Sequence, residues 1–341
     1  MSYPIEPPVT PMLARAQKEM PLGDEWLYEP KWDGFRAICF KDGDQIHIGS
    51  RNTRPLERYF PELIPELLSA LPPRCVVDGE IVVEGPSGLD FDALLLRIHP
   101  AASRVKMLAE QSPSTFVAFD LLADESDRRG EPLSDRWHRL MGSVEPKDRV
   151  FASPQTKDPK VAADWFTRFE GAGLDGIVAK KADGAYLPGE RAMIKVKHLR
   201  TADCVVGGYR ASKDGEGIGS LLLGLYAGDV LHYVGHTSSF NRAQKHEILE
   251  LLQPLRGEDG FGIGRTPGGP NRWTQAASVE WTSVRPELVC EVSFDHLQGE
   301  RFRHAATFRR WRPDRDPGSC TFDQLEAPHP YLLEKVRKLS D

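Results

Sequence analysis

The chain has 341 residues, of which 40% are hydrophobic and 28% charged, a composition typical of globular proteins. A single core rarely grows beyond about 250–300 residues, so we expect two domains, and no apolar run reaches the roughly 18 residues that a membrane span needs. The net charge of −6 excludes a general attraction to nucleic acid, although residues 180–200 and 301–315 are locally basic. Five scattered cysteines without a CxxC pair argue against a disulfide framework or a zinc site. Because the N-terminus lacks the order of a signal peptide, we expect a cytoplasmic protein.

The first two hundred residues mix strand-like and helical segments. Residues 35–40 and 45–51 flank an Asp-Gly turn and predict a hairpin. Apolar periodicity predicts three helices, the first interrupted at Pro65, over 60–71, 133–144 and 159–173. Short β-branched and aromatic runs predict strands over 75–85, 114–122, 174–181 and 192–198. Because the elements do not alternate strictly, we expect an α+β domain with mostly antiparallel sheets over residues 1–199.

The pattern changes after residue 199. One clear helix over 241–255 lies between the third and the fourth of five strand-like segments. These segments are 204–211, 220–228, 230–238, 287–296 and the arginine-rich stretch 301–315. This arrangement predicts a small Greek-key β-barrel of the OB type over residues 200–341, a fold that often binds nucleic acid.

Chemistry is first indicated by the Lys-x-Asp-Gly turn that begins at Lys31. A lysine amine is a nucleophile only when it is neutral, which burial and neighbouring cations favour. Gly34 would let the backbone approach a ligand closely. Such a four-residue match arises by chance in roughly one chain in ten of this length. A surface hairpin with Lys31 and Asp33 in solvent is therefore an alternative that this turn alone leaves open.

Further fragments follow the turn in a fixed order, and together they are more specific. They are Arg36, the Gly-Ser-Arg that ends in Arg51, Asp-Gly-Glu at 78–80, Phe-Val-Ala-Phe-Asp at 116–120, DGIVAKK at 175–181, IKVK at 194–197 and FRRWRPDRDP at 308–317. This order closely resembles that of the covalent nucleotidyltransferase superfamily, which contains ATP-dependent DNA ligases, RNA ligases and mRNA capping enzymes. YLPGER at 186–191 resembles the small bacterial DNA ligases of the C type and the ligase domain of ligase D. The resemblance spans residues 29 to 317.

The resemblance implies a nucleotidyltransferase (adenylation) domain, an OB-fold domain and a three-step reaction. Lys31 would attack the α-phosphate of ATP to give lysyl-AMP, AMP would pass to the 5′-phosphate of a DNA nick, and the 3′-hydroxyl would displace it. Lys195 and Lys197 would hold the α-phosphate. Phe119 would stack on adenine, whose edge would meet the backbone carbonyl of Glu29.

The remaining roles that the resemblance implies concern the sugar, the metal and the leaving group. Arg36 and Glu80 would contact the ribose, Arg51 the ribose or DNA phosphate, and Lys180 the sugar or phosphate. Glu80 and Asp175 would bind Mg²⁺ or Mn²⁺, which four negative charges on ATP require. Asp33 would orient the turn. Three residues on the barrel would stabilise departing pyrophosphate: Arg312, Asp314 and Arg315.

Several positions have a simpler explanation or depart from the family pattern. Phe119 could be a core residue on the face of Val117, and the two lysines at 195 and 197 share a strand face that could point to solvent. The arginines of 308–317 could only neutralise DNA phosphates. Asp175 stands where relatives have glutamate, and Met193 where many have tryptophan.

Four other functions were weighed against DNA ligation. A capping enzyme would use GTP, an NAD-dependent ligase would need a nicotinamide-binding domain before Lys31, and an RNA ligase shares the core motifs. A nucleic-acid-binding protein without catalysis would not need the full set of charged residues. We therefore expect a monomeric ATP-dependent ligase that seals nicked duplex DNA in DNA repair, with no membrane contact and with no repair partner identified by the sequence.

Overall fold

The computed structural model describes residues 3–86, 88–212, 215, 217–257, 260–261, 267, 280–295, 297–325 and 331–339. Its internal contacts divide the chain into two compact units. Unit 1 comprises Met1–Lys197 together with Ala327–Asp341, and unit 2 comprises His198–Glu326. The division near residue 198 lies close to the expected boundary at 199, but the C-terminal segment groups with unit 1 rather than with the OB-type unit.

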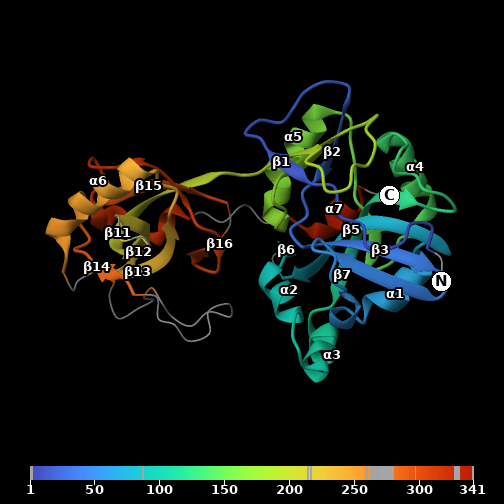
Figure 1. The fold of residues 1–341 in the computed structure, drawn as a ribbon, viewed down its shortest axis with the longest axis horizontal. Helices are drawn as coiled ribbons and strands as arrows, with labels where there is room; N and C mark the ends of the chain where they lie inside the picture. Colours follow the sequence, from blue (N-terminus) through green and yellow to red (C-terminus); the bar gives the residue numbers. More distant parts are fainter. Residues whose placement is uncertain are drawn as a thin grey trace. The chain divides into compact units, whose positions relative to one another are not determined.

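Unit 1 contains two mainly antiparallel sheets (Figure 1). The smaller sheet has four strands in the order β1 (Ala14–Ala16), β10 (Met193–Val196), β9 (Ile177–Lys181) and β2 (Trp26–Pro30). The larger sheet has the order β4 (Gln45–Ser50), β3 (Phe35–Asp42), β5 (Arg74–Gly85), β7 (Ser114–Ala123) and β8 (Val150–Ala152), with β6 (Gly88–Leu89) paired to β5. Among the described strand pairs of this unit, β1–β10 and β7–β8 are parallel and the others antiparallel. The expected α+β class is confirmed.

The helices of unit 1 cover these sheets with their apolar faces. They are α1 (Leu63–Ala70), α2 (Phe91–Arg97), α3 (Ala102–Gln111), α4 (Leu133–Ser143), α5 (Pro159–Arg168) and the C-terminal α7 (Leu333–Arg337). In α1 the expected interruption at Pro65 is wrong, because the helix begins at Leu63. Pro65 therefore lies in the first turn, where a backbone N–H has no acceptor within the helix and a proline is tolerated.

A buried cluster beneath β2, β9 and β10 connects these strands to helices from distant parts of the chain. It contains Trp26, Ile177 and Val196 from the strands and Trp165 from α5. Val336 of α7 is fully buried in the same cluster. The strands that carry the candidate lysines thus rest on a core that includes the C-terminal helix.

Unit 2 is built on one antiparallel sheet with the strand order β13 (Val230–Thr237), β12 (Ile218–Ala227), β11 (Arg200–Ala211), β15 (Val289–Phe294) and β18 (Thr307–Trp311), with β14 (Thr282–Ser283) also paired to β11. The helix α6 (Arg242–Leu252) begins with a capping box formed by Asn241 and Gln244. A two-stranded ribbon of β16 (Leu297–Gln298) and β17 (Arg301–Phe302) precedes β18.

This topology shows that the expectation of a closed barrel is wrong. In the part of unit 2 that the structure describes, β13 and β18 are the outer strands and no ladder joins them. A single parallel bridge between Thr237 and Ala306 connects the two edges, and the amide of Ala306 donates to the carbonyl of His236. The strands and the helix of an OB-type unit are present, but the sheet stays open.

Two further expectations concern cysteines and membranes. All five cysteines are free and buried, as expected. Among the described residues, no helix is long and apolar enough to cross a membrane.

Candidate active site

Lys31 follows the last residue of β2 and is held by the backbone of the segment before β9. Its amide donates to the carbonyl of Gly176 at 2.8 Å, and the amide of Asp175 donates to the carbonyl of Lys31 at 2.9 Å. Gly176 has a φ of 112°, and a Cβ at this position would lie 2.1 Å from the carbonyl oxygen of Val196. Glycine is required where β2, β9 and β10 approach so closely, because any side chain would push the strands apart.

This close approach gathers three lysines around one carboxylate. Oδ2 of Asp175 lies 2.6 Å from Nζ of Lys31 and 2.8 Å from Nζ of Lys197, and only 3% of its side chain is exposed. Burial, followed by repulsion from Lys197 and Lys31, lowers the pKa of Lys195. The expected group of Lys31, Lys195 and Lys197 is therefore together in space, and Asp175 compensates part of its charge.

A pocket of about 260 Å³ opens beside Lys31. Residues from both sheets and from the N-terminal segment line it, and the sequence had singled out eight of them: Glu29, Lys31, Asp33, Arg36, Arg51, Glu80, Phe119 and Lys195. Met193 and Val178 add apolar surface to the wall. Cationic, acidic and apolar groups that lie far apart in the chain thus face one cavity, as a phosphorylated ligand with a flat base would require.

Phe119 reaches this pocket through an irregularity in β7. Asp78 pairs with Asp120 and Gly79 pairs with Ala118, so Phe119 is an extra residue opposite the β5 strand, as in a β-bulge. Bulges redirect side chains. The Phe119 ring is 4% exposed, lines the pocket and belongs to none of the buried apolar clusters of the described residues. Phe119 is therefore a buried residue that also lines the pocket, and its stacking on adenine stays a prediction.

Two cations face the ring of Phe119. Cζ of Arg36 lies 4.4 Å from the ring centroid, and Nζ of Lys180 lies 4.5 Å from it. Lys180 also forms a buried ion pair of 2.6 Å with Glu29. Burial raises the pKa of Glu29, against the opposing effect of Lys180. Lys180, expected on the sugar or phosphate side, thus lies beside the expected adenine platform.

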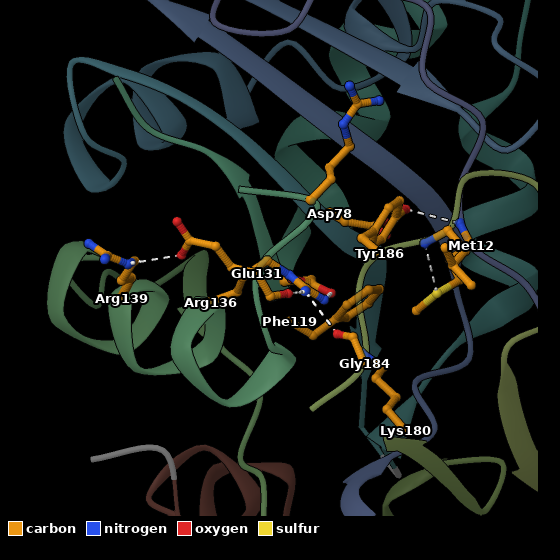
Figure 2. Close-up of polar contacts among 12 residues, drawn as sticks. Met12, Asp78, Phe119, Glu131, Arg136, Arg139, Lys180, Gly184 and Tyr186 are labelled. Atoms are coloured by element: carbon orange, nitrogen blue, oxygen red, sulfur yellow. Dashed lines mark hydrogen bonds and ion pairs between the residues drawn. The ribbon is translucent and has the colours of Figure 1, made fainter. Parts of the chain in front are cut away.

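A buried network fixes Arg36. Asp78, which is fully buried, accepts from Nε and Nη2 of Arg36, both at 2.6 Å. The hydroxyl of Tyr186 donates to Asp78 at 2.5 Å and accepts from the amide of Met12 at 3.0 Å (Figure 2). Arg36 is therefore positioned by β5, by the loop between β9 and β10, and by the N-terminal segment.

A second buried pair lies behind Phe119. The guanidinium of Arg136 from α4 donates to both carboxylate oxygens of Asp120, at 2.8 and 3.0 Å. It also donates to the carbonyl of Gly184 at 3.1 Å (Figure 2). Both side chains are essentially inaccessible. Because Asp120 follows Phe119 directly, this pair anchors the bulge and the loop that carries Tyr186 to the same helix.

Glu80 has a different environment from the other carboxylates. It lies on β5 and lines the pocket, and no ion pair holds it within the described part of the chain. Burial raises its pKa to about 7, although Arg36 and Lys31 act in the opposite direction. Glu80 can therefore change its charge near neutral pH, whereas Asp175 is paired with lysines.

The candidate leaving-group residues lie in unit 2 and are paired there. Nη1 of Arg312 lies 2.9 Å from Asp203, Nη2 lies 2.9 Å from Asp314, and Nε of Arg315 lies 3.5 Å from Asp203. Hydrogen bonding to Arg312 lowers the pKa of Asp314 to about 2. Asp203 was not predicted, and it organises both arginines.

Four residues of these networks were absent from the sequence-based set. They are Asp78, Tyr186, Gln155 and Asp203. Asp78 belongs to the Asp-Gly-Glu motif that ends in Glu80, and Tyr186 is the first residue of YLPGER. Membership of these motifs was the sequence signal that could have identified both residues. Gln155 and Asp203 lie outside those motifs, and only the folded structure brings them to their partners.

The class of protein follows from this architecture and is confirmed by comparison with known sequences. Two antiparallel sheets with a lysine-rich pocket, followed by an OB-type unit, form the arrangement of covalent nucleotidyltransferases. The family profile described as ATP dependent DNA ligase domain matches residues 11–197, and that described as ATP dependent DNA ligase C terminal region matches residues 214–315. The chain belongs to the ATP-dependent DNA ligase family.

Individual relatives agree with this assignment. The chain is 50% identical to DNA ligase C1 of Mycolicibacterium smegmatis over 350 aligned positions, covering 98% of this chain and 99% of that protein. It is 30% identical to the multifunctional non-homologous end joining protein LigD of Pseudomonas aeruginosa, covering 97% of this chain and 38% of that protein. A solved structure from a study of Lig E DNA ligases shares the fold, with a TM-score of 0.56 at 18% identity, covering 89% of this chain and all of that one. The expected identity as an ATP-dependent DNA ligase is confirmed.

Proposed function

We propose that this ligase seals nicks in duplex DNA through AMP bound covalently to Lys31, and that it acts in DNA repair. The observation that carries the proposal is the pairing of Lys31 and Lys197 with Asp175 beside a pocket that Lys195 and Phe119 line. The names of its relatives, DNA ligase C1 and the end-joining protein LigD, support the role in repair. A monomer in the cytoplasm remains our expectation.

The first step would use the lysine cluster. The neutral amine of Lys31 attacks the α-phosphorus of ATP, a nitrogen–phosphorus bond forms, the bond to the bridging oxygen breaks and pyrophosphate leaves. Asp175 lies within proton-transfer distance of that amine. Lys195 and Lys197 supply positive charge where negative charge develops on the phosphate, which lowers the barrier.

The next two steps transfer AMP and join the strands. The 5′-phosphate oxygen of the nick attacks the lysyl-bound phosphorus, which frees Lys31 and leaves AMP on the DNA end. The 3′-hydroxyl then attacks the 5′-phosphorus, the phosphodiester bond forms and AMP leaves. Arg312, Asp314 and Arg315 are the candidates for contacts with pyrophosphate or DNA. The two arginines would exchange part of their pairing with Asp203 for those contacts.

The donor set fits a divalent cation only in part, as expected for Mg²⁺ or Mn²⁺ bound with ATP. Among the described residues, no group of three or more His, Cys, Asp or Glu side chains could hold a metal. Mg²⁺ commonly uses one or two carboxylates together with phosphate oxygens and water, and Glu80 and Asp175 would supply the carboxylates. When bound, the ion would neutralise charge on the triphosphate.

The proposal is tested with ATP labelled at the α-phosphate. The protein with Mg²⁺ should retain the label through denaturation, Lys31→Ala should retain none, and the matched control Lys181→Ala should retain it, because Lys181 pairs with Glu25 outside the pocket. Label on Lys31→Ala would assign the nucleophile elsewhere. Sealing of nicked duplex RNA in preference to nicked duplex DNA would overturn the proposed substrate.

A further inference from the structure

One buried polar atom beside the pocket has no role in the networks above. Nε2 of Gln155 donates to Oε2 of Glu29 at 3.0 Å and to the backbone carbonyl of Phe119 at 3.4 Å. Its side-chain oxygen, Oε1, is buried, and no described residue donates a hydrogen bond to it. An unsatisfied buried acceptor is uncommon because it loses its hydration without compensation.

The orientation of this amide is fixed by its partners. Both partners, the carboxylate of Glu29 and the carbonyl of Phe119, are acceptors, so only the NH₂ end of Gln155 can face them. Oε1 therefore remains an acceptor without a donor. Its two neighbours both line the pocket, and one of them is the ring on which we place adenine.

We propose that Gln155 selects adenine over guanine by accepting a hydrogen bond from the 6-amino group through Oε1. The inference rests on the proposed function, since it requires the base to stack on Phe119. Adenine carries a donor at position 6, whereas guanine carries a carbonyl that would place two acceptors against each other. The ion pair of Lys180 with Glu29 would favour the same base. Lys180 can donate to the unprotonated N1 of adenine, whereas guanine has an N–H at this position.

A site that satisfies a buried polar group only with the correct substrate discriminates strongly, since the wrong substrate leaves that group unpaired. Gln155 acts at the same time on the pocket wall, because it holds the carboxylate of Glu29 and the backbone of the Phe119 bulge. An experiment therefore has to separate the support that Gln155 gives to the pocket wall from its recognition of the base.

The separating experiment compares ATP with purine riboside triphosphate, which has hydrogen in place of the 6-amino group. We measure kcat/KM for formation of the labelled enzyme adduct. The unmodified ligase should prefer ATP by about tenfold, which corresponds to 1.4 kcal/mol. Gln155→Leu and Gln155→Met should lose that preference, because their kcat/KM with ATP falls while their kcat/KM with the analogue changes little. Their preference for ATP over GTP should also fall about tenfold.

The control is Gln111→Leu, which changes an exposed glutamine at the end of α3 and should keep the ATP preference. The proposal is overturned if the variants slow both nucleotides equally, because Gln155 would then only support the wall, or if the unmodified enzyme does not distinguish the two. Failure of the unmodified enzyme to form any adduct would instead contradict the proposed function. Thermal unfolding of each variant shows that it is folded, and Gln155→Met provides a second near-isosteric change.

Discussion

Asp175 shows how one side chain can organise a cationic site. A buried carboxylate is stable when it is paired, and here it pairs with Lys31 and Lys197 at once. The expectation from sequence was a metal ligand, one methylene shorter than the glutamate of relatives. In the free protein its contacts are with the lysines, which places the amine of Lys31 at a defined position before ATP arrives. Preorganisation of this kind would reduce the cost of aligning the proposed nucleophile.

Glu80 should make the stability of unit 1 depend on pH. Its pKa in the folded state is about 7, above the ordinary 4.5, so between these values the folded state binds more protons than the unfolded state. The free energy of unfolding contributed by Glu80 therefore falls as pH rises from about 4.5 to 7, and the loss remains complete above that range. The glutamine of Glu80→Gln cannot ionise, so this variant should not show the loss of stability as pH rises.

Thermal unfolding in metal-free buffer measures this effect. At pH 8 Glu80→Gln should unfold several degrees above the unmodified protein. The rise of the pKa from 4.5 to about 7 corresponds to about 3 kcal/mol, and each kcal/mol shifts the unfolding of a domain of this size by about 2–4 °C. At pH 5 the difference should be much smaller, because the glutamate of the folded state is largely protonated there. An equal difference at both pH values would show that the substitution acts through packing and not through charge.

The sequence identified most of the charged residues of the site, because their order along the chain is informative even when no single motif is. Lys31, Glu80, Phe119 and Lys195 are all found at one pocket. Gln155 could not be found in this way. Its importance arises from an unpaired oxygen, and the pairing of an amide depends on atoms that lie 36 and 126 residues away in the chain.

At the scale of elements, the loop between β9 and β10 supports the pocket through Tyr186. Its hydroxyl joins the buried Asp78 of β5 to the amide of Met12. The backbone adds two links, from the amide of Leu13 to Glu190 and from the amide of Met193 to Leu13. The N-terminal segment that lines the pocket is thus attached to the loop that precedes β10.

Tyr186→Phe should therefore weaken ATP binding more than catalysis. Loss of a hydrogen bond to a buried carboxylate costs about 1.5–3 kcal/mol, and Arg36 would lose part of its support. We expect KM for ATP in adduct formation to rise several-fold with a smaller change in kcat. Tyr28→Phe is the matched control, because it loses a hydroxyl hydrogen bond to the carbonyl of Pro21 away from Arg36. An equal rise in KM for both variants would contradict a specific role for Tyr186.

Elements were predicted best where periodicity was strong and worst where local signals were short. The longer strands of both units and the helices α4, α5 and α6 follow the sequence pattern, whereas the strands β1, β2, β6, β8 and β14 were not predicted. Helices α2, α3 and α7 were missed, although Asp90 caps α2 by accepting from the amide of Ala93. The bulge at Phe119 could not be predicted, because alternation along one strand does not reveal an extra residue relative to its partner.

At the scale of the whole molecule, the chain leaves unit 1 at residue 197 and returns to it after unit 2. Tyr331 donates its amide to the carbonyl of Gly171, and its ring lies 5.5 Å from that of Phe169. Leu333 and Val336 of α7 are buried in the cluster beneath β2, β9 and β10. Unit 2 is consequently connected to unit 1 at both of its ends. The sequence analysis, which placed all of residues 200–341 in the second domain, did not predict this return.

This return predicts that the C-terminal helix stabilises the adenylation site. Val336→Asp would place a carboxylate in a fully buried apolar position, next to the core under the strands that carry Lys180 and Lys195. We expect unit 1 to unfold several degrees lower and adduct formation to be lost at a correspondingly lower temperature. Leu332→Asp is the control, because its side chain is 63% exposed one turn away. If both variants changed the unfolding of unit 1 equally, α7 would not be part of its core. If only Val336→Asp does, the helix that follows unit 2 in sequence is a structural part of the unit that carries Lys31.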